Sequence, residues 1–157
     1  IFQYFRAERT GEELRRMQES YAQLQEDCVE KERRLNSLET QFIALRDRHT
    51  VHIPMAGTSI APQAYALLHW NPERNQAFLD ASGLPTPPTD RQYQLWAIVK
   101  GQPTDMGVVP LESPSDTLHP VPFVETPEAF AITLEPRGGS PQPTLDQMYV
   151  LGPVPGR

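Results

Sequence analysis

The distribution of proline along the chain limits its fold more than any other feature. All 17 prolines of the 157 residues lie after residue 53, and eight of the nine glycines lie after residue 56. Proline removes a backbone donor and clashes inside a helix, so a long helix can form only in the first third of the chain. Residues 1–50 also hold 19 of the 34 charged residues, in nearly balanced signs. The sequence therefore predicts two structural parts, residues 1–50 and residues 51–157.

Apolar residues in the first part recur at steps of three and four. Such spacing over about five heptads is typical of the a and d positions of a coiled coil. A helix over residues 8–48 would be about 60 Å long, more than a domain of about 100 residues can cover. We therefore expect a parallel coiled-coil stalk in a homodimer, with docking onto the chain's own domain as the alternative. The predicted interface residues are Leu14, Met17, Tyr21, Leu24, Cys28, Leu35, Leu38, Phe42 and Leu45.

The charges and core residues predict that this coil has only modest stability. In a parallel pair, Arg34 lies opposite the partner's Glu39, which is favourable, whereas Asp27 lies opposite the partner's Glu32, which is not. Lys31 at a core position also weakens the middle of the coil. The a positions lack β-branched residues, so a trimer stays open as an alternative to the dimer.

Cys28 is the single cysteine and occupies one of the predicted core positions. One cysteine excludes an intrachain disulfide framework and a multi-cysteine metal site. In an oxidising compartment, Cys28 could link the two chains of a parallel dimer. The alternative is a small buried hydrophobic side chain. The sequence leaves both uses open.

The second part alternates short apolar runs with turn residues, about one run every ten residues. This pattern, with no convincing helix, predicts an all-β antiparallel sandwich domain over residues 51–157. Residues 71–75, NPERN, are expected to form a hairpin turn, and residues 85–90 and 110–127 are proline-rich connections. The predicted strands are His49–Ala56, Ala64–Trp70, Gln76–Ala81, Gln92–Lys100, Met106–Leu111, Leu118–Val124, Ala129–Glu135 and Gln147–Leu151.

The most distinctive segment, FAITLEPRGGSPQPT at residues 130–144, joins an alternating strand to a rigid turn. Its glycines permit backbone angles closed to other residues, and its prolines hold the flanking chain extended. Glu135 and Arg137 flank the turn. We expect them either to pair with the turn amides or with each other, or to form part of a recognition surface. Phosphate binding is not expected, because no helix follows the glycines.

Together with YQLWAIVKG at residues 93–101, this segment resembles the C-terminal, extracytoplasmic domain of the anti-sigma-K factor family. The run TLEPRGGSPQPT is the specific part of the match. Weaker matches lie at residues 64–70, 78–85, 107–109 and 148–152. The resemblance therefore covers most of residues 51–157, and the stalk lies outside its motifs.

The resemblance implies regulation of transcription by a single-pass protein of the inner membrane, with this chain on the periplasmic side. A cytoplasmic segment, absent from these residues, would hold an extracytoplasmic-function sigma factor inactive, and a membrane protease would release it. The run IFQYFR at residues 1–6 then fits the membrane exit of a spanning helix, although Arg6 and Arg9 favour the cytoplasmic side. The alternative is an arbitrary boundary.

No catalytic pattern is visible in the sequence. There is no HExxH, GxSxG or CxxC motif, so we expect no enzyme, no cofactor and no metal site. A net charge of −6 argues against a nucleic-acid partner. A second hypothesis is a module that binds carbohydrate or peptidoglycan through exposed Trp70, Trp96 or Tyr149. A third treats the coil as the function and the β domain as an inert cap.

Overall fold

The computed structural model describes residues 2–111 and 118–156, with side chains from residue 9 onward. The chain divides into two compact units, Ile1–Phe42 and Ile43–Arg157. Each unit is described by itself. Part of the predicted connection at 110–127, residues 112–117, lies outside the described residues, as do Ile1 and the side chains of the predicted membrane-exit run at residues 1–6.

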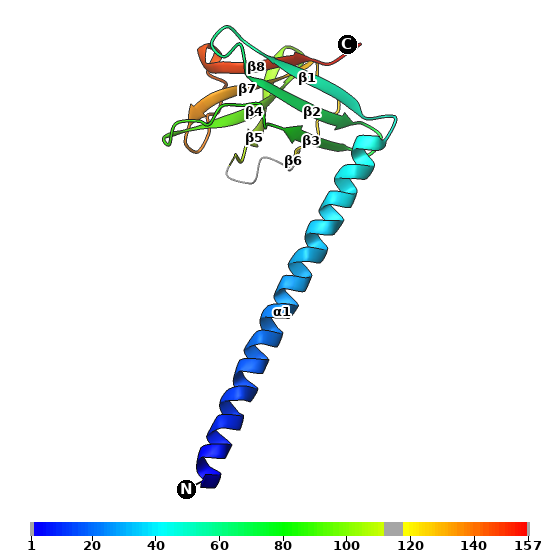
Figure 1. The fold of residues 1–157 in the computed structure, drawn as a ribbon. Coiled ribbons are helices and arrows are strands. Elements are labelled where there is room, and N and C mark those ends of the chain that lie inside the picture. Colours follow the sequence, from blue (N-terminus) through cyan, green and yellow to red (C-terminus); the bar gives the residue numbers. More distant parts are fainter. Residues whose placement is uncertain (1, 112–117, 157) are drawn as a thin grey trace. The chain divides into compact units, whose positions relative to one another are not determined.

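Helix α1 spans Phe2–Arg46 as one uninterrupted helix (Figure 1). It contains no proline, and its only glycine is Gly11, so nothing in its interior removes a helical hydrogen bond. The helix ends where the Thr50 hydroxyl donates to the Ala44 carbonyl. Among the described residues, no helix has both the length and the apolar character that crossing a membrane requires.

Asp47, just after the last helical residue, makes two contacts within the β unit. Its carboxylate accepts from the His49 backbone N–H at 3.0 Å and from Arg74 Nε at 2.7 Å. These bonds lower the pKa of Asp47 to about 2, with the His49 amide the larger cause and Arg74 the next. Both contacts lie within residues 43–157, so they stabilise the β unit itself.

The β unit consists of eight antiparallel strands in one sheet, ordered β5-β4-β7-β8-β1-β2-β3-β6. All eight predicted strand segments are present, although β5 begins four residues before the predicted start and β6 is only three residues long. A 3₁₀ turn, η1 (Leu145–Gln147), precedes the last strand. The strands are β1 (Val51–Gly57), β2 (Tyr65–Asn71), β3 (Gln76–Asp80), β4 (Arg91–Val99), β5 (Gln102–Val108), β6 (His119–Val121), β7 (Ala129–Pro136) and β8 (Met148–Pro153).

The expected two-sheet sandwich is replaced by a single sheet that curls almost into a barrel (Figure 1). Its two halves are joined by only two residue pairs between β1 and β8, Ala56 with Leu151 and Gly57 with Val150. Register shifts in β4 and β7 add further curvature. The alternating pattern shows which side chains face inward, but it does not show whether strands at the corner are hydrogen-bonded. A sandwich and a curled sheet therefore give the same sequence signal.

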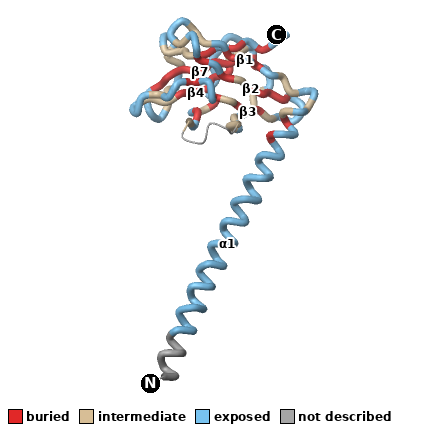
Figure 2. Tube along the Cα trace, in the orientation of Figure 1, coloured by how far each residue is buried: buried red, intermediate tan, exposed pale blue. Residues whose placement is uncertain are grey.

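The curled sheet encloses the apolar core, and both of its faces are covered over β4. Tyr93, Leu95 and Ala97 lie in the interior cluster of buried apolar residues. Trp96 points to the other face and is nonetheless 1% exposed. Figure 2 shows the buried residues concentrated in the strands. Strand β4 is hydrogen-bonded on both sides, to β5 and to β7, and side chains on both of its faces are buried.

Candidate functional site

The turn at residues 136–144 is held by the carboxylate of Glu135, at the end of β7. Glu135 is fully buried. Its Oε1 accepts from the Thr133 hydroxyl at 2.5 Å and from the Thr144 backbone N–H at 2.7 Å. Its Oε2 accepts from the Ser140 hydroxyl at 2.8 Å and from the Thr144 hydroxyl at 2.7 Å. Four donors from the strand and the turn therefore converge on one charge.

This arrangement keeps Glu135 ionised although it is buried. Burial alone would raise the pKa of the carboxyl, but the bonds from Thr133, Thr144 and Ser140 together outweigh it and hold the pKa below its ordinary value. A carboxylate that accepts several hydrogen bonds is stabilised in its charged form. Glu135 is thus a structural anchor, and its carboxylate is not accessible from the surface.

Two glutamines of β4 bind the same turn from the side. Gln94 donates from Nε2 to the Ser140 carbonyl at 3.0 Å and accepts the Ser140 N–H at 2.8 Å. With its amide oxygen facing the turn, Gln92 accepts the N–H groups of Gly138 and Gly139 at 2.6 Å each. Both glycines have positive φ, 98° and 84°, which other residues rarely adopt. The predicted rigid corner is therefore a backbone clamped by side chains.

The network continues to Trp96, whose indole Nε1 donates to the Thr133 hydroxyl at 2.8 Å. Thr133 in turn donates to Glu135, so one hydroxyl joins the buried indole to the buried carboxylate. We call Gln92, Gln94, Trp96, Thr133 and Glu135 the turn clamp. Sequence reasoning identified the turn and Glu135 but missed the donors. The sequence does contain a signal for these donors. Thr133, Ser140 and Thr144 carry hydroxyl groups near a glutamate that lies in an otherwise apolar strand.

Of the two residues predicted for a recognition surface, only Arg137 lies on the surface. Its side chain is exposed, and its backbone N–H donates to the Asp90 carbonyl at 3.1 Å. The clamp therefore fixes the backbone on both sides of Arg137. The structure separates the roles of the two residues: Glu135 holds the turn from inside, and Arg137 is presented at its outer side.

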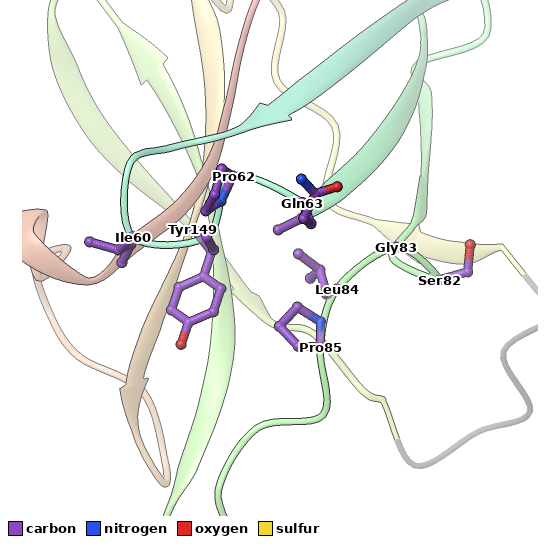
Figure 3. A pocket seen from close by; sticks show the side chains of 10 residues that line it. Ile60, Pro62, Gln63, Ser82, Gly83, Leu84, Pro85 and Tyr149 are labelled. Carbon is purple, nitrogen blue, oxygen red and sulfur yellow. The ribbon is translucent and has the colours of Figure 1, made fainter.

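A small apolar pocket of about 470 Å³ lies beside Tyr149 on β8 (Figure 3). Ile60, Pro62, Leu84 and Pro85 surround its ring, and Gln63 and Ser82 supply polar groups at its edge.

Tyr149 packs edge-to-face against Tyr93, with ring centroids 5.1 Å apart. The Tyr93 hydroxyl donates to the Pro85 carbonyl at 3.0 Å. Burial, followed by the influence of Tyr149, raises the pKa of Tyr93 well above its usual range. Of the three aromatic residues predicted as ligand contacts, Trp70 and Trp96 are buried, and Tyr149 is half-buried at this pocket.

Two histidines form a cross-strand pair between β1 and β2. His52 and His69 are paired in register, and their Nδ1 atoms lie 2.7 Å apart, so one imidazole donates to the other. His69 is buried, and the pKa of its imidazole is lowered, first by burial and then by the charge of His52, against a smaller opposing effect of Asp80. Within the described residues, no group of three or more His, Cys, Asp or Glu is placed to hold a metal ion.

The predicted coiled-coil residues form an exposed stripe along α1. From Leu14 to Phe42 its large apolar side chains are between 43 and 70% exposed. Cys28 is exposed, and Leu45, which belongs to the β unit, is half-buried. The part of the stripe from Leu14 to Phe42 and the turn clamp lie in different units of the chain.

Comparison with known proteins finds a family model that covers the helix as well as the β unit. The family model described as "Anti-sigma-K factor rskA, C-terminal" matches residues 6–153, which includes the helix outside the sequence motifs. The chain is 27% identical over 96 residues to a Streptomyces griseus protein described as "Uncharacterized protein in phr 5'region". That match covers 61% of this chain and 40% of the relative. No solved structure matches the chain.

Proposed function

The chain belongs to the anti-sigma-K factor family, and from this premise we propose that it is the extracytoplasmic regulatory region of a single-pass inner-membrane anti-sigma factor. The partner is an extracytoplasmic-function sigma factor, bound by a cytoplasmic segment outside these residues. The observation that carries the proposal is the family match over residues 6–153, which takes in both the helix and the sheet. The family is regulatory, which is consistent with the expectation that the chain is not an enzyme.

In this proposal the β unit controls access of a membrane protease or senses a signal on the periplasmic side. A rigid surface suits such a role because it presents fixed side chains without an ordering cost on binding. Support comes from the turn clamp, whose hydrogen bonds fix the backbone around an exposed arginine. The hydrogen bonds of the turn clamp give a structural reason for several residues of the run TLEPRGGSPQPT, which is the specific part of the family resemblance.

We further propose that α1 forms a parallel homodimeric stalk. Support comes from the apolar stripe, which is exposed over about four heptads of α1. An exposed apolar stripe of this length is stabilised when a second helix covers it. Val29 provides a matched control: it is also apolar and exposed on α1, at 47%, but it lies outside the stripe.

The stalk is tested by measuring the solution mass of residues 1–157 with light scattering. We expect a dimer for the native chain and for Val29→Asp, and a monomer for Leu24→Asp, which places a charge at a core position. Residues 43–157 should be monomeric. A monomeric native chain, or equal effects of the two aspartates, would refute the stalk; a mass three times that of the chain would replace the dimer with a trimer.

The direction of the two helices is tested with a single engineered cysteine. In a Cys28→Ser background, Leu14→Cys lies near one end of the stripe, and an in-register parallel pair brings the two thiols together. Mild oxidation should then produce a covalent dimer at high yield. Cys28→Ser without the new thiol is the control. A non-covalent dimer that resists cross-linking at this position would indicate antiparallel helices.

The regulatory role is tested in the organism that carries the gene. Deleting residues 43–157 while keeping the rest of the protein should change transcription of the genes that depend on the cognate sigma factor, measured by RNA sequencing. A variant with Phe42→Ala alone keeps the β unit and controls for disturbance of the helix. Unchanged sigma-dependent transcription after the deletion would contradict a sensory or gating role for the β unit.

A carbohydrate- or peptidoglycan-binding module remains the second candidate, supported by the half-buried ring of Tyr149 at its pocket. Sugar rings stack on exposed aromatic faces, and the two tryptophans considered for this purpose are buried. This second function is tested by titrating the chain with muropeptides and measuring the heat of binding by calorimetry. Binding that is lost in Tyr149→Ala but retained in Tyr65→Ala would support this candidate, and no heat with muropeptide would remove it.

A further inference from the structure

The apolar stripe on α1 is interrupted at one point, where Lys31 takes the place of an apolar residue. With Leu14 at an a position, Lys31 falls at a d position, between Cys28 and Leu35. Its side chain is exposed, and among the described residues it makes no ion pair. A charged residue in the core of a coiled coil costs stability, but it can specify how the helices align.

Two acidic residues flank Lys31 in the heptad, whose seven positions are written a to g. Asp27 is at g, one turn before Lys31 on the same helix, and Glu32 is at e. Both side chains are exposed, and neither takes part in an ion pair within the part of the chain that the structure describes. Asp27 precedes Lys31 by four residues, which is the favourable order for an acid and a base on one helix. The single helix therefore leaves one cation and two anions open to a partner.

A parallel, in-register pair of helices would bring these three charges together. In such a pair, a d residue inserts into a hole between residues of the other helix, and the e residue of that helix borders the hole. Lys31 would then lie beside the partner's Glu32, which also faces Asp27 as a like-charged g and e pair. The Lys31 ammonium, on its flexible four-carbon chain, reaches both carboxylates. The core lysine and the like-charged pair each weaken the coil when taken alone, but together they offset each other.

We propose that Lys31 is a pairing residue of the stalk, whose ammonium binds Asp27 of its own chain and the partner's Glu32. The two-fold symmetry of a dimer forms this triad twice, so the layer contains two cations and four carboxylates. The triad turns the weakest layer of the coil into a contact that is specific to the in-register pair. This inference rests on the parallel dimer of the proposed function and identifies what aligns its two helices.

A shift of the two helices by one heptad would break the triads. Each lysine would then pack against a leucine of the other chain, either Leu24 or Leu38, so two apolar layers would be disturbed in place of one. One of the two lysines would also lie beside Gln25, which carries no charge, in place of Glu32. Only the in-register pair therefore gives both lysines a carboxylate from each chain.

The test is the sign of the effect when Glu32 loses its charge. If Glu32 only repels Asp27 across the coil, Glu32→Gln should tighten the dimer. If Lys31 binds Glu32, the same variant should raise the dissociation constant of the dimer by about three- to fivefold, because two exposed ion pairs are lost per dimer. Glu30→Gln, also exposed on α1 but outside the stripe, is the matched control and should leave the constant unchanged. Sedimentation equilibrium of the whole chain, at concentrations that span the dissociation constant, measures these effects.

Removing the lysine should reverse the sign of the effect. Lys31→Met keeps a long, unbranched side chain but leaves Asp27 and Glu32 as an uncompensated like-charged pair. In this background, Glu32→Gln should therefore lower the dissociation constant, again by about three- to fivefold. Glu30→Gln should have no effect in either background.

The outcomes separate this inference from the stalk on which it rests. A monomeric native chain would refute both. A dimeric native chain would leave the stalk standing, but the triad would be overturned if Glu32→Gln tightened association, if it behaved like Glu30→Gln, or if its effect kept the same sign in Lys31→Met. A trimer would overturn the triad as well, because its helices are aligned by three-fold contacts.

Discussion

The sheet and the helix use the same apolar residue types in opposite ways. Phe130 in β7 is fully buried, whereas Phe42 on α1 is 57% exposed. The sheet buries its side chains within one chain, and the stripe on α1 keeps its side chains open. The difference indicates that the β unit has an apolar core of its own, whereas the stripe on α1 is covered only in the dimer that we propose. Both tryptophans, Trp70 and Trp96, lie in the β unit, so their fluorescence reports on that unit alone.

The largest expected effect contrasts these two phenylalanines directly. Phe130→Ala should lower the free energy of unfolding of the β unit by about 3 to 5 kcal/mol, because it leaves a cavity in the core. Phe42→Ala should leave that free energy unchanged and weaken only the self-association of the chain. Urea unfolding followed by tryptophan fluorescence measures the first effect, and light scattering measures the second. Similar losses of unfolding free energy would show that the two regions are not independent.

The turn clamp should be the next most sensitive feature, and the helix has no counterpart to it. Glu135→Gln keeps the shape of the side chain but removes the charge that four donors share. We expect a loss of about 2 to 3 kcal/mol in the free energy of unfolding, since the buried donors are left poorly satisfied. The exposed Glu125→Gln is the control and should change stability by less than about 0.5 kcal/mol.

Glycine substitutions should act in opposite directions in the two regions. Gly139 has a φ of +84°, and an added Cβ would lie 2.8 Å from Gln94 Oε1, so Gly139→Ala should cost about 1 to 2 kcal/mol. Gly11 lies inside α1, with no other heavy atom within 4 Å of an added Cβ. Gly11→Ala should therefore stabilise the helix by about 1 kcal/mol. Thermal melts followed by tryptophan fluorescence and by circular dichroism separate the two effects, and equal signs would contradict the assignment.

The sequence predicted the positions of the strands well because alternation is a local property. Each of the eight strands overlaps a predicted apolar run, although β5 begins four residues earlier, in the exposed segment 102–105. The joining of the two halves into one sheet could not be predicted, because it depends on the two residue pairs between β1 and β8, far apart in the chain. The burial of Glu135 was hidden for a similar reason. Its donors include Ser140 and Thr144, which reach it only after the turn has folded back.

Trp96 illustrates how the two kinds of information combine. Alternation placed it on the face opposite Tyr93 and Leu95, and that face could have been open to a ligand. The structure shows the indole bonded to Thr133 and covered, so the second face of β4 is closed within its own chain. Tyr149 could not be distinguished from the tryptophans by sequence, because all three lie in strands of similar apolar character. Only packing separates a core aromatic residue from one that lines a pocket.

The smallest expected effect concerns pH and again separates the regions. The pKa of His69 is lowered in the folded state, so the unfolded chain binds its proton more readily. Stability from this group is fully present above a pH of about 6.5 and is lost as the pH falls from there through the lowered pKa. Its surroundings are His52 on β1 and Asp80 on β3, which oppose each other. The carboxylates of Asp47 and Glu135, with lowered pKa values, titrate below this window.

Urea unfolding of the β unit at pH values of about 7.5 and 5.5 should therefore show lower stability in acid, without any corresponding change at the stripe. His69→Gln should remove most of this dependence, because it leaves a neutral group beside His52, whereas His119→Gln should preserve it. If the dependence survived in His69→Gln, the histidine pair would not be its source. The loss of stability in acid would then have to come from other ionisable side chains of the sheet whose pKa differs between the folded and unfolded states.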